Sequence, residues 1–331
     1  MSAPITSVVM SVYNGGRYLR ESVESILSQE FADFEFLIVN DGSKDESPDI
    51  LAEYARQDKR IRILDQENRG LTRALVRGCS EARGCYIARQ DADDWSHPRR
   101  LRRSVEVLDR SPQLAMVGSW ARYIDAVGDE VESVERPADP QVATHQLLHQ
   151  RLGPPAHGSV MFRRSAYEAV GGYRACFYYA QDSDLWQRLA SAGQVAYVQE
   201  YLYHYRLTPE AISGAQTPVQ WQFGELGQRC NAARLRGESE EPFLRQAEAL
   251  RTLVLEGKVT TSGVRRRRAA ANYRIGTGLS RRGNPRARQY FWTAIRLNPL
   301  HWRSWCRLCA EFVRPPRQDV TPPDLITEGN K

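Results

Sequence analysis

The N-terminal part of the chain alternates between short apolar runs and amphipathic segments. The apolar runs are rich in β-branched residues, as expected for buried parallel strands, and they occupy residues 5–12, 34–39, 61–64 and 86–88. The segments between them have helical spacing and occupy residues 18–27, 47–56 and 70–82. This alternation predicts a mostly parallel sheet with helices on both of its faces.

Beyond residue 95 the pattern is less regular but keeps the same two kinds of segment. Strands are expected at residues 116–124, 159–162 and 195–206. Helices are expected at residues 98–110, 142–150, 165–170 and 181–192. The polar stretch 125–139 is expected to form a hairpin or an excursion from the sheet. After residue 214 only helices are expected, at residues 219–235, 242–256, 267–281, 285–297 and 299–312.

The chain has 331 residues, which is enough for one large domain and a smaller one. It contains no run of about 18 apolar residues, and its N-terminus lacks a basic segment followed by an apolar one. We therefore expect neither a transmembrane helix nor a secretory signal. The six cysteines show no disulfide framework, and the Cys306-x-x-Cys309 pair lacks the second pair that a zinc site needs. A reduced, cytoplasmic protein fits these features best.

The positive charge of the chain is concentrated in its C-terminal third. Residues 216–331 hold 21 Lys or Arg against 10 Asp or Glu, a balance of +11, whereas residues 1–215 have a balance of −5. This split suggests two units with different partners.

Three carboxylates crowd into residues 90–95, QDADDW, directly after the fourth apolar run. They repel one another and resist burial unless a cation or hydrogen-bond donors neutralise them. A divalent metal with oxygen ligands is one interpretation of the cluster, and an acidic surface turn is the other. Tyr13 and Asp41 also follow predicted strands, and ligands of such sheets gather at the carboxyl ends of strands, which favours a site. The sequence has no GxGxxG motif after its first strand and no P-loop motif, which disfavours dinucleotide binding of the Rossmann kind and P-loop chemistry.

Six blocks of the sequence resemble those of family-2 glycosyltransferases of the GT-A fold, in the same order and spacing. The blocks are MSVYNGGRYLRESVESILSQEF, LIVNDGS, ARQDADDW, HGSVMFRRS, VGGY and QDSDLWQRLASAG. The similarity extends from residue 3 to about residue 214. It implies an α/β GT-A fold and the transfer of a sugar from a nucleotide-diphosphate donor, with a UDP-sugar favoured, to an acceptor hydroxyl with inversion at the anomeric carbon.

The resemblance also implies a donor pocket at the strand ends. Asp41 matches the family aspartate that accepts a hydrogen bond from the imide N–H of uracil or thymine. The alternative is a turn aspartate that caps the following segment, which is an ordinary role for this residue type. Tyr13 matches a position at which the ring contacts the base, and a core tyrosine is the alternative. Arg73 either reaches the phosphate or base or is a solvated surface charge. The predicted donor-binding residues are Ser11, Tyr13, Asn14, Asp41, Arg73, Asp91 and Ala92.

Asp93 matches the metal-binding aspartate of the family's Asp-x-Asp motif. The match implies Mn²⁺ or Mg²⁺ that bridges the donor phosphates. Asp91 would assist through the ribose or a metal-bound water, and Asp94 either supports the site or caps the turn. Because Asp93 supplies a single protein ligand, we expect weak metal binding that nucleotide strengthens.

Asp182 aligns with the family's general base, which would take the proton from the acceptor hydroxyl. The residue before it is usually Glu in the family and is Gln181 here, so one negative charge is missing. The alternative role for Asp182 is the N-cap of the helix that follows. His157 either lines the acceptor or donor-sugar pocket or is a structural histidine. The residues assigned to the acceptor side, or to its support, are Asp94, His157, Gln181 and Trp186.

We predict three regions: residues 1–215 as the GT-A catalytic domain, 216–313 as a basic α-helical region and 314–331 as a disordered tail. Residues 270–299 resemble a tetratricopeptide-type hairpin, which cannot bury its apolar face alone. The Trp and Arg residues of the helical region form a basic aromatic surface. Peripheral contact with the inner face of an anionic membrane and a solvated helical face are its open alternatives. Nucleic-acid binding is not expected, since no recognised module is present.

These features together predict a metal-dependent, inverting glycosyltransferase that acts on a carbohydrate or lipid-linked acceptor. Its place in the synthesis of a cell-surface polysaccharide or glycolipid is implied by the resemblance alone. The alternative is a non-catalytic member of the same fold that binds nucleotide sugars or acts as a scaffold. The presence of Asp41, Asp93 and Asp182 argues against that alternative.

Overall fold

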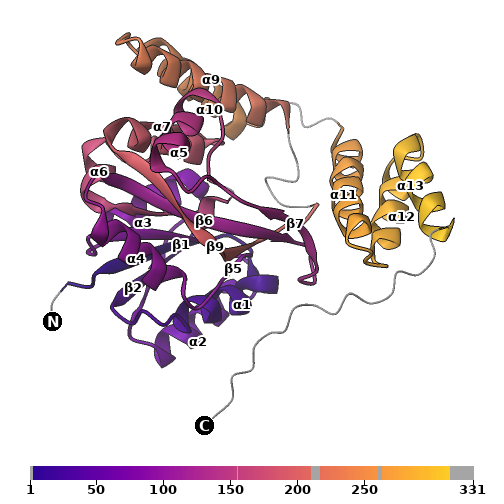
Figure 1. Cartoon of the computed structure of the whole chain (residues 1–331), viewed down its shortest axis with the longest axis horizontal. Helices are drawn as coiled ribbons and strands as arrows, with labels where there is room; N and C mark the ends of the chain where they lie inside the picture. Colours follow the sequence, from indigo (N-terminus) through magenta and orange to yellow (C-terminus); the bar gives the residue numbers. More distant parts are fainter. Residues whose placement is uncertain (1–2, 155, 210–216, 260–262, 314–331) are drawn as a thin grey trace. The chain divides into compact units, whose positions relative to one another are not determined.

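The computed structural model describes residues 3–154, 156–209, 217–259 and 263–313, and these residues divide into two compact units (Figure 1). Of the described residues, unit 2 holds 129–131, 208–209 and 263–313, and unit 1 holds the others. The predicted tail, residues 314–331, lies outside the described residues. The helical region that was predicted to begin at residue 216 is divided between the two units.

The N-terminal half of the sheet is parallel, as the alternating pattern predicts. Its spatial order is β3-β2-β1-β4, and the strands are β1 (Thr6–Val12), β2 (Phe34–Asn40), β3 (Ile61–Asp65) and β4 (Tyr86–Asp91). In this register Ser11 on β1 lies level with Val39 on β2 and Asp91 on β4. The carboxyl ends of these strands therefore meet at one edge of the sheet.

The remainder of the sheet is mixed. It contains β5 (Trp95–Ser96), β6 (Leu114–Ile124), β7 (Glu130–Val134), β8 (Met161–Arg163) and β9 (Gln194–Arg206). Strand β8 runs antiparallel to both β4 and β6, and β9 is parallel to β6 but antiparallel to β5. The predicted α/β class is confirmed. The antiparallel direction of β8 was not predicted, because a three-residue strand carries no pattern that indicates its direction.

Helices cover both faces of the sheet. One face packs against α1 (Gly16–Leu27), α2 (Ser47–Gln57) and α4 (Arg100–Arg110). The other face packs against α3 (Leu71–Ser80), α5 (Pro140–His149), α6 (Arg164–Ala169) and α7 (Gln181–Ala192). The short 3-10 helix η1 (His157–Ser159) precedes β8.

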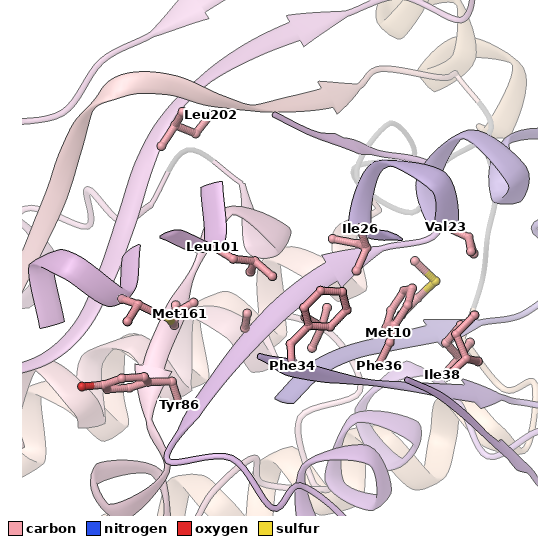
Figure 2. Close-up of a cluster of buried hydrophobic side chains, with 14 of the residues drawn as sticks. Met10, Val23, Ile26, Phe34, Phe36, Ile38, Tyr86, Leu101, Met161 and Leu202 are labelled. Carbon is pink, nitrogen blue, oxygen red and sulfur yellow. The ribbon is translucent and has the colours of Figure 1, made fainter. Parts of the chain in front are cut away.

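Alternation along β1 divides the core into two layers. Met10 belongs to the layer under α1 and α2, whereas its neighbour Val9 belongs to the opposite layer with Leu75 of α3. Figure 2 shows the first layer, in which side chains from β1, α1 and β2 meet Leu101 of α4 and Leu202 of β9. Strand β1 is buried on both faces. Its sequence is therefore largely apolar and does not alternate between apolar and polar residues.

Two helices of the C-terminal third, α9 (Pro218–Leu235) and α10 (Glu241–Leu255), belong to unit 1. They enclose the fully buried ring of Phe177, which lies 6.4 Å from the ring of Phe223 on α9. Arg174 forms ion pairs with Asp184 on α7 and with Glu240 directly before α10. These helices therefore support the segment that leads into α7.

Unit 2 contains α11 (Val264–Arg281), α12 (Ala287–Leu297) and α13 (Trp302–Val313). Helices α11 and α12 form the helical hairpin that was expected near residues 270–299; its kinship with tetratricopeptide repeats stays a prediction. A Cβ added at Gly276 would lie 2.9 Å from the ring of Phe291, so glycine allows the two helices to approach closely. Among the described residues, no helix has the length and hydropathy needed to cross a bilayer.

The buried carboxylate of Glu35 joins the start of β2 to two neighbouring segments. It accepts hydrogen bonds from Ser7 Oγ at 2.7 Å, from the Arg83 N–H at 2.8 Å and from the Arg62 guanidinium at 2.9 Å. Burial alone would raise the pKa of Glu35, but hydrogen bonds led by those from the Arg83 side chain and Ser7 outweigh it and lower the pKa. The ionised form therefore stabilises the fold at neutral pH.

We expect Glu35→Gln to lower the free energy of unfolding at pH 7 by about 1–3 kcal/mol, because the amide loses the charge and one acceptor oxygen. Since the folded-state pKa is lowered, the contribution of Glu35 is complete above the ordinary glutamate pKa and is lost as the pH falls through the folded-state value. The difference between wild type and variant should therefore shrink on acidification. Urea unfolding at neutral and acidic pH measures both effects.

Glu53→Gln is the matched control, because Glu53 pairs with Arg20 at 2.8 Å on the exposed surface. Exposed ion pairs contribute little to stability. Equal losses at Glu35 and Glu53 would contradict the role assigned to the buried carboxylate.

Candidate active site

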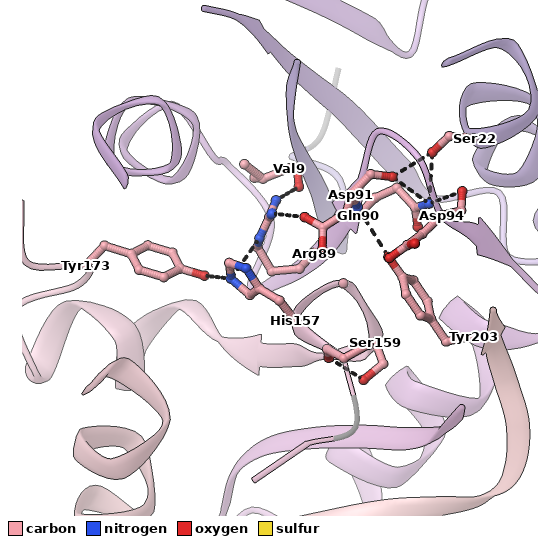
Figure 3. Close-up of polar contacts among 12 residues, drawn as sticks. Val9, Ser22, Arg89, Gln90, Asp91, Asp94, His157, Ser159, Tyr173 and Tyr203 are labelled. Carbon is pink, nitrogen blue, oxygen red and sulfur yellow. Dashed lines mark hydrogen bonds and ion pairs between the residues drawn. The ribbon is translucent and has the colours of Figure 1, made fainter. Parts of the chain in front are cut away.

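The candidate site is built at the carboxyl edge of the parallel strands. Ser11 and Asp91 are level on β1 and β4, and the Asp41 N–H, just past β2, donates to the Val12 carbonyl at 2.8 Å. The buried side chain of Gln90 stabilises the turn after β4. Its amide donates to Ser22 Oγ at 3.0 Å and to the Asp94 carbonyl at 3.1 Å (Figure 3). The predicted cluster therefore lies at a strand end, next to the predicted donor residues.

Arg89 is fully buried beside this cluster, and its side chain connects three elements (Figure 3). Its guanidinium pairs with Asp91 Oδ1 at 2.8 Å, donates to the Val9 carbonyl on β1, and reaches His157 Nε2 at 3.3 Å. Removing one partner of a buried ion pair typically costs about 3–5 kcal/mol, because the other charge is left uncompensated. Arg89 and Asp91 therefore depend on each other.

The other two aspartates of the cluster have perturbed acidity. Burial raises the pKa of Asp93 to about 6, and the negative charge of Asp91 adds to the shift. Burial also raises the pKa of Asp94 well above its ordinary value, with further contributions from Asp93 and Asp91. Like charges that crowd a buried site favour the neutral form of one of them, or a cation between them.

Arg206, the last residue of β9, supports the turn from the other side. Its N–H donates to Asp94 Oδ1 at 2.7 Å, and its Nε donates to the Asp93 carbonyl at 2.9 Å. The guanidinium also pairs with Glu21 of α1 at 2.7 Å. Asp94 thus joins the turn to β9, and its role in supporting the site stays a prediction.

The buried carboxylate of Asp41 fixes the turn before α3. Oδ1 accepts from Gln66 Nε2 at 2.6 Å and from the Arg69 N–H at 2.9 Å, and Oδ2 accepts from the Gly70 N–H at 2.9 Å. A carboxylate has about four lone-pair positions, so these bonds leave acceptor capacity on Asp41. The structural role and the predicted role toward a base are compatible.

The other predicted donor residues are more exposed than Asp41. Tyr13 is half-exposed, and Asn14 has a left-handed backbone (φ 50°) and accepts the Lys44 N–H at 2.8 Å. Ala92 is partly buried next to the core layer under α1. Arg73 is exposed on α3, and among the described residues it forms no hydrogen bond or ion pair with the aspartates.

His157 lies at the start of η1, beyond Arg89 as seen from Asp91 (Figure 3). Burial lowers the pKa of His157 well below its usual value, and the positive charge of Arg89 lowers it further. The imidazole is therefore neutral, and its Nε2 lies 2.7 Å from the Tyr173 hydroxyl. His157 therefore belongs to a series of polar contacts that runs from Tyr173 through His157 and Arg89 to Asp91.

Asp182 lies in the first turn of α7, and the capping interpretation is wrong. The N-cap residue is Ala180, whose left-handed backbone (φ 58°, ψ 21°) is unusual for alanine, and no side chain caps the helix. Burial raises the pKa of Asp182; the Ser183 N–H, which donates to Oδ1 at 2.8 Å, opposes the shift, and the charge of Asp91 adds to it. Asp182 and Asp91, far apart in the sequence, therefore share one electrostatic environment.

Gln181 and Trp186 are buried and help to hold α7 in place. The Trp186 ring meets the His157 ring edge-on, with centroids 5.6 Å apart, and packs near Phe162 on β8. Trp186 thus belongs to the hydrophobic core and packs against His157. Asp184 pairs with Arg188 at 2.6 Å and with Arg174 at 3.3 Å, so its role is structural.

The segment before α7 is fastened to α3. Thr72 Oγ1 donates to the Phe177 carbonyl at 2.6 Å, and both residues are buried. At Gly70 (φ 84°) an added Cβ would lie 3.1 Å from the Tyr178 ring. The turn held by Asp41 and the segment that carries Asp182 are therefore in contact.

The donor set at the end of β4 fits a hard divalent cation, which prefers oxygen ligands. Burial and the negative charge of Asp91 both raise the pKa of Asp93, and a bound cation would offset both effects. Among the described residues, no group of three His, Cys, Asp or Glu side chains is arranged to hold a metal ion. The protein's own ligands would need oxygen atoms from a bound molecule to complete such a site.

Two functional residues, Arg89 and Arg206, were not predicted from the sequence. A signal for Arg89 was present, because a strand places residues i and i+2 on the same face, and Asp91 is two residues further on. No local signal indicated Arg206, because it meets the cluster only through the pairing of β9 with β6 and β5.

The chain is similar in sequence to known glycosyltransferases. The model of the family described as "Glycosyl transferase family 2" matches residues 7–171. The chain is 36% identical over 216 residues to "Putative glycosyltransferase EpsE" of Bacillus subtilis (strain 168), covering 64% of this chain and 76% of that protein. It is 31% identical over 211 residues to "Uncharacterized glycosyltransferase MJ1057" of Methanocaldococcus jannaschii, covering 62% of this chain and 72% of that protein.

Solved structures of glycosyltransferases share the fold, and the predicted GT-A fold is thereby confirmed. TarS 1-349 of S. aureus in complex with UDP-GlcNAc superposes with a TM-score of 0.58 at 14% identity, over 91% of each chain. The mannosyltransferase PcManGT of Pyrobaculum calidifontis in complex with GDP-Man and Mn²⁺ gives a TM-score of 0.53 at 17% identity, over 95% of this chain and 86% of that chain. At these identities the likeness extends to the fold alone.

We expect Thr72→Val to lower the free energy of unfolding by about 1–3 kcal/mol, because the buried Phe177 carbonyl loses its donor while the side-chain shape is kept. Thr72→Ser keeps the hydroxyl and loses only a methyl group, so its loss should be smaller. Urea unfolding of the three proteins measures the difference. If Thr72→Val is as stable as Thr72→Ser, the hydrogen bond does not fasten this segment.

Proposed function

The chain belongs to glycosyltransferase family 2, and we propose that it transfers a sugar from a UDP-sugar to an acceptor hydroxyl by direct displacement, with inversion at the anomeric carbon. One observation carries the proposal: contacts join the acidic turn after β4 to the helix that carries Asp182. Arg89 pairs with Asp91 at 2.8 Å and reaches His157, whose ring meets that of Trp186 on α7. A direct displacement needs charge stabilisation on one side of the sugar and one base on the other.

The donor base is the partner that we propose for Asp41. The acceptor position that remains on its carboxylate can accept the imide N–H of uracil, and three hydrogen bonds from the turn before α3 hold the carboxylate in place. The half-exposed ring of Tyr13 offers an apolar face to the base. Ser11, level with Asp91, lies between the two groups along the sheet edge.

The donor diphosphate would lie next to Asp93 and Asp91. We propose that Asp93 would hold Mn²⁺ or Mg²⁺ with the help of oxygen atoms of the diphosphate, while Arg89 holds Asp91 in place through their ion pair. A divalent cation supplies stabilisation of the charge that develops on the departing nucleotide diphosphate. Arg206 and Asp94 hold the backbone of the turn against β9 and thereby orient the Asp93 carboxylate.

Asp182 is the proposed general base. Its carboxylate takes the proton from the acceptor hydroxyl as the oxygen attacks the anomeric carbon. A neutral Gln181 takes the place of the family's usual Glu, so the pKa of Asp182 is raised by burial and by Asp91 without that further charge. The neutral His157 adds no positive charge to this environment.

Family membership is also the support for the acceptor class. We propose a carbohydrate or lipid-linked acceptor, in the synthesis of a cell-surface polysaccharide or glycolipid on the cytoplasmic side of the membrane. The catalytic domain would then be the part of the chain up to residue 215, with α9 and α10 supporting the segment before Asp182.

Asp182→Asn should reduce kcat by about 10²–10⁴-fold, because the amide cannot accept the proton. The measurement is release of nucleotide diphosphate, and transfer, across a panel of nucleotide sugars that includes UDP-GlcNAc and GDP-mannose, with Mn²⁺ present. Asp49→Asn is the matched control, because Asp49 is an exposed aspartate in the first turn of α2. Full activity of Asp182→Asn would refute the base assignment.

The same assay gives a pH profile. The base works only when ionised, and its raised pKa means that activity falls on acidification at a higher pH than an ordinary aspartate would give. If the wild type binds a donor but turns over none in the panel, the proposed transfer reaction is wrong.

Metal binding should depend on nucleotide. Mn²⁺ should bind the chain weakly alone and at least about tenfold more tightly with UDP, because the diphosphate supplies oxygen ligands that the protein lacks. Calorimetric titration with and without UDP measures this, and Asp93→Asn should remove the gain. Equal affinity in the absence of UDP would show that the ligands come from the protein alone.

A further inference from the structure

Helix α13 exposes its aromatic side chains. Ser304, Leu308 and Glu311 are buried, whereas Trp302, Trp305 and Phe312 are exposed. The spacing of three and seven residues puts these three rings on one side of the helix. A surface helix normally buries its large apolar side chains and exposes its polar ones. Because α13 buries one leucine with two polar residues and leaves three rings outside, the rings need a partner.

Residues of α12 and of the turn before α13 extend this surface. Trp292 meets Trp305 edge-on with ring centroids 6.4 Å apart, and the Trp305 indole N–H donates to the Pro299 carbonyl at 3.0 Å, next to Leu300. The side chains of Leu300, Phe312 and Trp302 are 84%, 69% and 66% exposed. We call this surface the tryptophan face; it consists of Trp292, Leu300, Trp302, Trp305 and Phe312.

Arginine surrounds the tryptophan face. The guanidinium of Arg303 lies 5.5 Å from the ring centroid of Trp302, and that of Arg288 lies 5.0 Å from that of Phe312. Residues 263–313 contain 12 arginines and one acidic residue, Glu311. Glu311 is buried and hydrogen-bonded to Ser280, so this segment exposes no carboxylate.

We propose that the tryptophan face docks on the surface of an anionic phospholipid bilayer. Exposed Trp, Leu and Phe side chains beside arginines are the composition of helices that lie in a membrane interface. The indole rings enter the boundary between headgroups and acyl chains, and the arginines meet the lipid phosphates.

Two other partners fit this surface less well. Nucleic acid would attract the arginines and stack on the indoles, but it offers no apolar environment for Leu300. A second copy of the chain would bring the same excess of arginine to both sides of the interface. The inference does not rest on the sugar-transfer chemistry, because none of these residues belongs to unit 1.

Vesicle co-sedimentation of the full chain tests the proposal, with phosphatidylcholine vesicles compared with vesicles that also contain phosphatidylglycerol. The wild type should sediment with the anionic vesicles, and less so at high salt. The double variant Leu300→Ser, Trp302→Ser should bind at least about tenfold more weakly, because two exposed apolar side chains lose their contact with lipid. Arg296 is exposed on α12, one helical turn after Trp292. Arg296→Gln together with Arg303→Gln should also weaken binding to anionic vesicles.

Trp221→Ser is the matched control, because Trp221 is 70% exposed but lies on α9 in unit 1; it should bind vesicles like the wild type. Release of nucleotide from the donor should be unchanged in all of these variants, so a failure of docking is distinguishable from a failure of transfer.

Three results would overturn the proposal. The first is a wild type that does not bind anionic vesicles, and the second is a Leu300→Ser, Trp302→Ser variant that binds them as well as the wild type. The third adds a further observation to the first. The wild type does not bind vesicles but binds a labelled DNA duplex, or forms a dimer detected by sedimentation, and the double variant loses that interaction. That result would assign the face to nucleic acid or to a second copy.

Discussion

Negative charge confined to the end of a buried strand is the constraint on which this structure depends. Asp91, Asp93 and Asp94 follow one another in a turn that is largely removed from water, and two arginines offset their charge from inside the protein. Arg89 is fully buried and pairs with Asp91, and Arg206 joins the same turn to β9. Since these arginines belong to strands in different halves of the sheet, charge compensation and sheet assembly depend on each other.

The two halves of the sheet make different contributions to the site. The parallel strands bring Ser11, Asp41 and Asp91 to one edge through simple register. The antiparallel strand β8 and the helix α7 bring His157 and Asp182 toward that edge from a separate part of the chain. The segment before α7 is fastened to α3 by Thr72 and enclosed by α9 and α10, so helices far along the sequence help to position a residue in the first turn of α7.

Residue patterns predicted most of the elements because the patterns are local. The β-branched run of β1, the amphipathic spacing of α1 and the acidic turn after β4 are all visible within a few residues of sequence. The direction of β8, the left-handed Ala180 and the position of Arg206 were not visible, because each depends on contacts with segments far away along the chain. The role of Asp182 as a helix cap was a reasonable local interpretation, and the tertiary structure replaced it with Ala180 at the N-cap position.

The sequence by itself determined the alternation of strands and helices, the place of the aspartate cluster at a strand end, and the helical nature of the C-terminal third. Tertiary structure decided which arginines compensate the aspartates, that Asp182 shares the environment of Asp91, and that α13 turns its aromatic stripe outward. The physical reason is the same in each case. Periodicity specifies that a helix has an apolar side and that a strand has two faces, but only packing against the rest of the chain decides which side is buried and which charges meet.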